Sequence, residues 1–254
     1  RIDVLTGGAI REFDPALAPE ISHLVVLPEQ GHVPNPLRLS QALAQRLRAG
    51  GATFVVRGVT GFELAGGRAQ RVLTGEGPVE TDTVVIAAGA HSNALSSQLG
   101  SEVPLETERG YHVMLASPSV QPRIPTASGE GKYFATPMEG GLRIAGAVEF
   151  AGLAASPNYD RADVLLEGAK RLFPGLAHGS VERWMGHRPS LPDSKPVIGR
   201  SPRARNAYFA FGHGHVGLTG APATAEIVAA LVAGETPAID PRPFAAERFR
   251  GAGR

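Results

Sequence analysis

The sequence predicts a mixed α/β (α+β) fold built from two interleaved parts. Residues 31–100 combine a capped helix with short strands. The last of these strands contains Thr83–Ala87, a continuously apolar run typical of a strand buried on both faces. From about residue 101 the strands become longer and the helices fewer, which indicates an antiparallel sheet. The composition agrees, because 254 residues with 43% hydrophobic content can bury a substantial core.

The first clear element is a helix that begins after Asn35 and ends at Gly50. Asparagine is a favoured N-cap, Pro36 suits the first turn, and glycine commonly ends a helix. We expect the buried stripe of this helix to consist of Leu39, Leu43 and Leu47.

A meander of short strands is expected next, because apolar runs alternate with glycine turns. Its predicted strands are 53–57, 61–64, 68–74 and 79–87. The last of these runs into Ala88-Gly89 and a short helix. Ligands in open α/β sheets bind at such strand ends.

The middle of the chain predicts an antiparallel sheet with one helix on it. The predicted strands are 108–116, 132–137, 141–149 and 180–187, and the helix is 159–172. The last third predicts strands at 197–199 and 207–211 and a helix at 222–233. This last helix is rich in alanine and nearly uncharged, so we expect it to be buried.

Charge and composition exclude several functions. A net charge of +1, with basic and acidic residues interspersed, argues against a nucleic-acid partner. The absence of cysteine excludes thiol chemistry and fits a cytoplasmic protein, with peripheral contact to the inner membrane face left open. No run of 18 apolar residues is present, so no transmembrane segment is expected.

Residues 212–217 read GHGHVG, which matches the G-x-G-x-x-G pattern of dinucleotide-binding folds. In those folds a further strand with an acidic residue follows about 20 residues later. Only one helix and a proline-rich tail follow here, so the loop is not a pyrophosphate loop. A glycine turn before a helix N-terminus still suits an anionic or polar ligand.

A stiff segment rich in proline and glycine, residues 184–199, holds Arg188, Asp193 and Lys195. The Arg188 guanidinium could bind a carboxylate through two parallel hydrogen bonds. The alternative is that Arg188 pairs with Asp193 and braces the loop.

Three histidines in this region raise the question of a metal site: His187, His213 and His215. No carboxylate lies at ligand spacing, and cysteine is absent. We therefore predict no metal.

Four segments together resemble the FAD-dependent D-amino acid oxidase superfamily, most closely its D-amino acid dehydrogenase and glycine oxidase branch. They occur in the family's order and span nearly the whole chain. They are GHVPNPLRLSQAL at 31–43, VVIAAGAHS at 84–92, RPSLPDSKPVIG at 188–199 and GHGHVGLTGAP at 212–222.

The resemblance implies a three-layer FAD-binding domain interleaved with an antiparallel β-sheet substrate domain. It assigns 31–100 and 192–250 to the FAD-binding domain, and 1–30 and 101–191 to the substrate domain. The family's N-terminal βαβ unit has no counterpart here, so the FAD-binding domain is partial. We expect this chain to be the C-terminal portion of such a protein, with a missing segment or a separate chain supplying the pyrophosphate site; the alternative is a degenerate relative. We expect these 254 residues alone to retain FAD weakly or not at all.

The resemblance also implies site residues. Arg188 and Tyr133 match residues that bind the substrate carboxylate, and His215 takes a pocket position; the alternative for Tyr133 is an aromatic packed in the core. Cofactor contacts are implied for Val59, Ala88, Gly89 and the loop Gly212, His213, Gly214, His215, Val216, Gly217, Leu218 and Thr219. No side chain is required as a catalytic acid or base.

The implied reaction is oxidation of an amino acid at Cα with FAD as cofactor, followed by hydrolysis of the imine to a 2-oxo acid and ammonia. Two alternatives stay open. One is oxidation of glycine, sarcosine or another secondary amine, and the other is a non-catalytic binding or assembly subunit.

Overall fold

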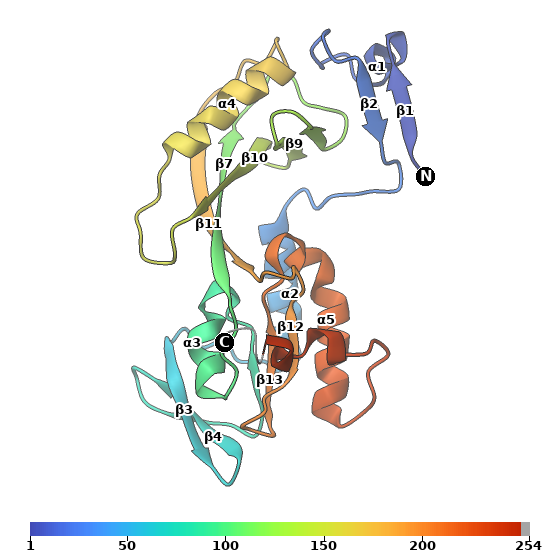
Figure 1. Cartoon of the computed structure of the whole chain (residues 1–254). Coiled ribbons are helices and arrows are strands. Elements are labelled where there is room, and N and C mark those ends of the chain that lie inside the picture. The colour runs from blue at the N-terminus through green and yellow to red at the C-terminus, as the bar shows by residue number, and fades with distance from the viewer. Residues whose placement is uncertain (250–254) are drawn as a thin grey trace. The chain divides into compact units, whose positions relative to one another are not determined.

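The computed structural model describes residues 1–249, which form two compact units whose segments alternate along the chain (Figure 1). Helices and antiparallel strand pairs occur together, so the prediction of a mixed α/β fold is confirmed. Unit 1 consists of Arg1–Phe54, Gly110–Glu149 and Ser156–Gly186, and unit 2 of Val55–Arg109, Phe150–Ala155 and the chain from His187 onward.

The structural units and the predicted domains differ chiefly at residues 31–54. This segment was expected with the FAD-binding residues, but it lies in unit 1. Its contacts explain the grouping, because Asn35 Nδ2 donates to Glu139 at 2.7 Å and His32 Nε2 hydrogen-bonds the Pro137 carbonyl at 2.9 Å. The domain assignment itself stays a prediction.

Unit 1 is built on a five-stranded sheet with the order β11-β7-β10-β9-β8, in which β10 pairs antiparallel with β9 and β9 with β8. One face packs against α4 (Asp160–Leu172), whose Ala162, Leu165 and Ala169 are buried at helical spacing. Acidic residues begin α4 and basic residues end it, which suits the helix dipole. The strands are β7 (Glu106–Leu115), β8 (Thr126–Ser128), β9 (Tyr133–Met138), β10 (Gly141–Phe150) and β11 (Val181–Ser190). The start of β7 as far as Arg109, the last residue of β10 and the end of β11 from His187 belong to unit 2.

The N-terminal part of unit 1 adds an antiparallel pair, β1 (Asp3–Thr6) and β2 (His23–Val26), joined through α1 (Gly8–Phe13). None of these elements was predicted from the sequence. Ile10 and Leu17 join the core cluster formed by α4 and the sheet, so this segment is anchored by apolar burial.

Helix α2 (Pro36–Ala49) confirms the predicted helix and its caps. Asn35 Oδ1 accepts a hydrogen bond from the Arg38 backbone N–H at 2.8 Å, and the Gly50 N–H donates to the Arg46 carbonyl at 3.1 Å. The predicted burial of its leucine stripe is wrong, because no described residue of unit 1 covers this face. The exposed fractions are 37%, 57% and 56% for Leu39, Leu43 and Leu47.

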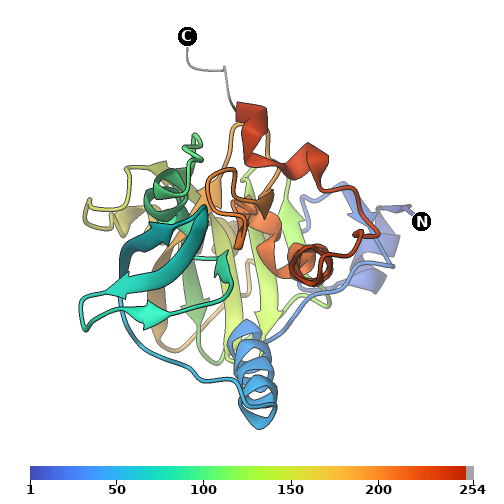
Figure 2. The same cartoon turned by 90° about the horizontal axis from the view of Figure 1, so that it is seen from below.

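Unit 2 contains two three-stranded sheets. In the first, with the order β12-β13-β6, β6 runs parallel to β13 and β12 antiparallel to it. The second is the predicted meander β3-β4-β5, whose twisted β3–β4 hairpin is seen in both views (Figure 2). The elements are β3 (Val59–Ala65), β4 (Arg68–Thr74), β5 (Val79–Glu80), β6 (Val84–Ile86), η1 (Gly89–His91), α3 (Ser92–Gln98), β12 (Val197–Arg200), β13 (Ala207–Phe211), η2 (Gly214–Val216), α5 (Gly217–Ala233), η3 (Arg242–Phe244) and η4 (Ala246–Phe249).

Two strand predictions in unit 2 are wrong. Residues 55–57, and 53–54 before them in unit 1, form no strand, and the predicted strand 79–87 is divided into β5 and β6. The division has a visible cause, because β5 pairs with β4 whereas β6 pairs with β13. Between them Asn206 Nδ2 donates to the Asp82 carbonyl at 2.8 Å and fixes the crossover from one sheet to the other.

Helix α5 begins at Gly217, earlier than predicted, and it places Pro222 inside the helix at the cost of one intrahelical hydrogen bond. Ile227 and Val228 pack against Ile198 and Tyr208 of β12 and β13. The predicted burial is wrong for most of the helix. Only 17% of an 18-residue window within Gly214–Ala233 is buried. By length and composition this stretch could cross a membrane, a test that core helices of soluble proteins also pass.

Candidate functional site

The two glycine-containing segments that were predicted to contact the cofactor lie at one edge of a sheet. β6 and β13 are adjacent and parallel, with Ala207 opposite Val84 and Phe209 opposite Ile86. Their carboxyl ends therefore meet at the same edge. Ala88-Gly89 follow β6 and the loop 212–219 follows β13, so both segments begin where open α/β sheets bind ligands.

An apolar cavity of about 460 Å³ follows β6 along unit 2. Its lining includes Val59 and Ala88, two residues predicted to contact the cofactor. Phe62 and Val72 of the meander and Leu95 of α3 complete its apolar wall. A mostly apolar cavity of this size suits one part of a large organic cofactor.

The glycines of these segments differ in what surrounds them. A Cβ on Gly212 (φ +83°) would lie 2.6 Å from Leu191 Cδ1, so this glycine is needed for internal packing. A Cβ on Gly214 (φ +54°) would meet nothing closer than 3.7 Å, and one on Gly89 (φ +55°) would meet nothing within 4 Å. The backbone at Gly89 and Gly214 is thus open to close approach by a ligand.

Of the other loop residues, two are exposed and one contacts α5. Val216 and Leu218 are 57% and 46% exposed. His213 instead turns inward, where its Nε2 lies 2.9 Å from Thr224 Oγ1. The Thr224 hydroxyl already donates to the Gly220 carbonyl at 2.9 Å, so it accepts from a protonated His213 Nε2. The side chain of His213 therefore fastens the loop to α5.

Burial lowers the pKa of His213 below its ordinary value of 6.5. The imidazole therefore binds a proton more readily in the unfolded chain than in the folded chain. As a result, the free energy of unfolding has its full value above pH 6.5 and falls as the pH drops below it. We expect His213→Gln, which keeps a donor for Thr224, to reduce this loss, at most by about 1.4 kcal/mol per pH unit. Urea unfolding at a series of pH values measures the slope.

The exposed residue Gln70 provides the control, since Gln70→Ala removes no titratable group and should leave the slope as it is in the wild type. Burial also lowers the pKa of His187, so part of the acid sensitivity should persist in the His213 variant. An unchanged slope in His213→Gln would contradict the inward placement.

Arg188 lies near the end of β11 in unit 2. Its NH1 atom is buried and has no hydrogen-bond partner among the described residues. Desolvation lowers the pKa of the guanidinium, and the charge of Glu108 acts in the opposite direction. A partly buried cation without a bonded anion is costly, so this arginine is well suited to an anionic ligand.

The alternative in which Arg188 braces its loop through Asp193 is wrong. Asp193 Oδ2 accepts from Arg248 Nε at 2.8 Å, and Lys195 Nζ lies 3.6 Å from the same atom. These cations hold the pKa of Asp193 below its usual range, with the Arg248 hydrogen bond as the main cause. Asp193 is thus already paired, and the bracing role belongs to Arg248.

The third predicted substrate residue, His215, forms a pair that the sequence did not predict. Its Nε2 donates to Glu108 Oε2 at 2.8 Å. Close by in the chain, Thr107 Oγ1 and His187 Nδ1 lie 2.9 Å apart and link β7 to β11. No local pattern marks Glu108, because its partner is 107 residues away along the chain.

Tyr133 lies in unit 1 and is only 5% exposed. Its hydroxyl donates to the Gly168 carbonyl of α4 at 2.6 Å, and its ring belongs to the core cluster of that unit. This geometry favours the alternative of a packed core aromatic. Its role in carboxylate binding stays a prediction.

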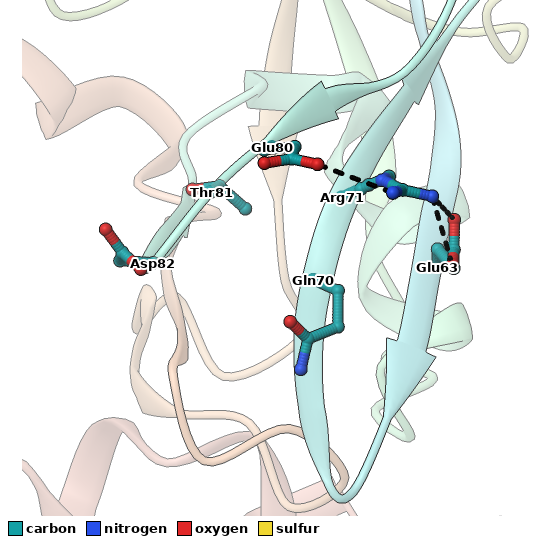
Figure 3. Close-up of a pocket in the computed structure, with 6 residues that line it drawn as sticks. All are labelled: Glu63, Gln70, Arg71, Glu80, Thr81 and Asp82. Atoms are coloured by element: carbon teal, nitrogen blue, oxygen red, sulfur yellow. Dashed lines mark hydrogen bonds and ion pairs between the residues drawn. The ribbon is translucent and has the colours of Figure 1, made fainter.

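A second cavity in unit 2, of about 380 Å³, is polar and lies over the meander (Figure 3). Arg71 bridges Glu63 and Glu80 there, with NH1–Oε2 and NH2–Oε1 distances of 3.1 and 3.4 Å. None of the predicted site residues lines it. Glu63, Glu80 and Asp82 outnumber the one cation, Arg71, so the lining is acidic, and its two ion pairs are exposed, where such pairs contribute little.

Comparison with known proteins gives a family for this arrangement. A sequence model of the family described as FAD dependent oxidoreductase (DAO) matches residues 1–231, which is most of the chain.

Individual relatives agree. The chain is 41% identical over 249 residues to a D-amino-acid oxidase from Bradyrhizobium diazoefficiens, covering 96% of this chain and 59% of the relative. It is 32% identical over 237 residues to a glycine oxidase from Pseudomonas putida, covering 92% and 64%. The crystal structure of glycine oxidase from Geobacillus kaustophilus is similar with a TM-score of 0.85 at 26% identity, covering 98% of this chain and 67% of that one. The chain thus spans less than two thirds of each of these two curated relatives.

Proposed function

This chain belongs to the FAD dependent oxidoreductase (DAO) family, and from that premise we propose that it forms the substrate side and the flavin-ring side of an enzyme that oxidises an amino acid at Cα, as D-amino acid dehydrogenases do. The observation that most supports this is the desolvated Arg188 guanidinium, which has no bonded anion within the described chain. An amino-acid carboxylate would supply that anion.

Each group has a stated role in this proposal. Arg188 binds and orients the substrate carboxylate. The open backbone at Gly89 and Gly214, with the apolar cavity beside β6, holds FAD. FAD, when bound, supplies the acceptor for the hydride that leaves Cα. The substrate nitrogen loses a proton, and water hydrolyses the resulting imine to a 2-oxo acid and ammonia.

The rest of the FAD site is proposed to come from a further segment or a separate chain. Two exposed apolar surfaces support this part of the proposal: the leucine stripe of α2, and α5, of which Thr224, Ile227 and Val228 are the buried residues. Contiguous exposed apolar surface usually marks a site that another protein surface covers. The relatives' greater length is consistent with such a covering part.

A second candidate function is oxidation of glycine or sarcosine, which the similarity to two glycine oxidases supports. Arg188 does not separate the candidates, because all these substrates have a carboxylate. The family's flavin chemistry argues against the third possibility, a subunit that binds without catalysis.

A substrate panel tests the proposal. The FAD-loaded protein, with the rest of the cofactor site supplied in the same or a separate chain, should be assayed with D-amino acids, their L-enantiomers, glycine and sarcosine, and the 2-oxo acid product trapped. Formation of a 2-oxo acid mainly from D-amino acids is the expected result. Preference for glycine or sarcosine would favour the second candidate, and no product from any substrate would overturn both.

A further inference from the structure

Glu108 is a partly buried carboxylate in unit 2, and among the described residues His215 is its hydrogen-bond partner. Its side chain is 22% exposed, and it accepts the hydrogen bond from His215 Nε2 at 2.8 Å. A carboxylate can accept several hydrogen bonds, so this one leaves capacity for a further donor. The side chain of His215, in η2, is itself 60% exposed.

Glu108 and Arg188 lie on neighbouring strands, β7 and β11. Thr107 and His187, the residues that precede them, touch across the two strands at 2.9 Å. Successive side chains of a strand point to opposite faces, so Glu108 and Arg188 share the other face. Their electrostatic coupling agrees, since Glu108 raises the pKa of Arg188 against the effect of burial.

A guanidinium beside a carboxylate is complementary to a zwitterion. An α-amino acid at neutral pH has its carboxylate and ammonium groups on the same carbon. When the carboxylate is bound by a guanidinium, the ammonium group therefore lies within a few bonds of it and can contact a neighbouring carboxylate of the protein. The described geometry provides both opposite charges, and neither hydrogen-bonds the other. Desolvation strengthens such contacts relative to those in water.

We propose that Arg188 and Glu108 bind the carboxylate and the ammonium group of one α-amino acid, and that His215 positions Glu108. This inference rests on the proposed function and adds the basis for preferring amino acids over other carboxylates. Glu108 is here a substrate-binding residue, and His215 acts through it.

Equilibrium binding measured by calorimetry tests the inference without turnover. 2-Aminoisobutyrate has no hydrogen on Cα and so binds without being oxidised, and 2-methylpropanoate is its counterpart without the amine. We expect the FAD-loaded wild type to prefer 2-aminoisobutyrate. Glu108→Gln should reduce that preference by about tenfold, which is about 1.4 kcal/mol, while binding of 2-methylpropanoate is kept or improved.

Glu102 provides a control, since it is an exposed glutamate of the same unit that lies outside β7, and Glu102→Gln should change the binding of neither ligand. His215→Leu should reduce the preference about threefold, and His215→Gln, which can still donate to Glu108, should restore it. A purely structural role would not be rescued in this way.

The outcomes separate the two proposals. If Glu108→Gln weakens the binding of both ligands equally, or of neither, the zwitterion inference is overturned while the proposed function stands. If the wild type binds neither ligand, the proposed function fails, and this inference fails with it.

Discussion

Replacing Arg188 with methionine is expected to weaken the binding of a carboxylate ligand by about 100-fold, or about 2.7 kcal/mol. The guanidinium is desolvated, and its NH1 has no partner in the described chain, so a bound carboxylate would gain a charge-assisted pair. The same change should leave the free energy of unfolding unchanged or raise it by about 1 kcal/mol, because methionine removes a poorly compensated buried charge. Calorimetry with 2-methylpropanoate and urea unfolding measure the two effects.

Two further variants sharpen this prediction. Arg188→Lys keeps the charge but loses the planar pair of donors, so the affinity for the carboxylate ligand should fall about tenfold. Arg200→Met removes an exposed arginine of the same unit and should leave the affinity unchanged. A stability loss in Arg188→Met without a change in affinity would assign Arg188 a structural role instead.

Replacing Asn206 with leucine is expected to lower the free energy of unfolding by about 3–5 kcal/mol. Asn206 is 5% exposed. Its Nδ2 donates to the carbonyls of Ala69 and Asp82 at 2.8 Å each, and its Oδ1 accepts from the Ala69 N–H at 2.8 Å. Leucine has a similar volume but leaves these backbone groups buried without partners, which costs more than the bonds themselves contribute.

The same substitution should also disturb the apolar cavity. Asn206 joins β4 to the residues just before β6, and both strands contribute to its lining. The control is Gln70→Leu, an exposed position next to Ala69, which should change stability by less than about 0.5 kcal/mol. Equal unfolding free energies for Asn206→Leu and wild type would show that the crossover does not depend on this side chain.

Local signals made parts of the fold predictable. The caps of α2 depend on Asn35 and Gly50, which act on neighbouring backbone groups, so the sequence contains all the information needed. The hairpin from β9 to β10 was equally accessible, because short apolar runs flank a tight turn.

Tertiary context limited the other predictions. The leucine stripe of α2 indicates an amphipathic helix, but periodicity does not reveal what covers it. The apolar composition of α5 likewise gave the helix but not its exposure. The single strand predicted at 79–87 is divided because Asn206, distant in the chain, fixes a crossover there.

The candidate site shows the same division. The approach of Ala88-Gly89 to the glycine loop follows from two strands that were predicted, once β6 and β13 are adjacent and parallel. The pairs Glu108–His215 and Asp193–Arg248 join residues 107 and 55 positions apart, and no local spacing indicates them. Arg188 was predicted through a family resemblance, and its unpaired NH1 is visible only in three dimensions.

Anaerobic reduction of the flavin by substrate tests the central claim most directly. The FAD-loaded protein, with the rest of the cofactor site supplied in the same or a separate chain, is mixed with D-amino acids, glycine and sarcosine while the visible absorbance of oxidised flavin is followed. The account predicts that at least one of these substrates bleaches the wild type and that Arg188→Met is bleached about 100-fold less efficiently. Absence of bleaching by every substrate, or equal bleaching of the two proteins, would contradict it.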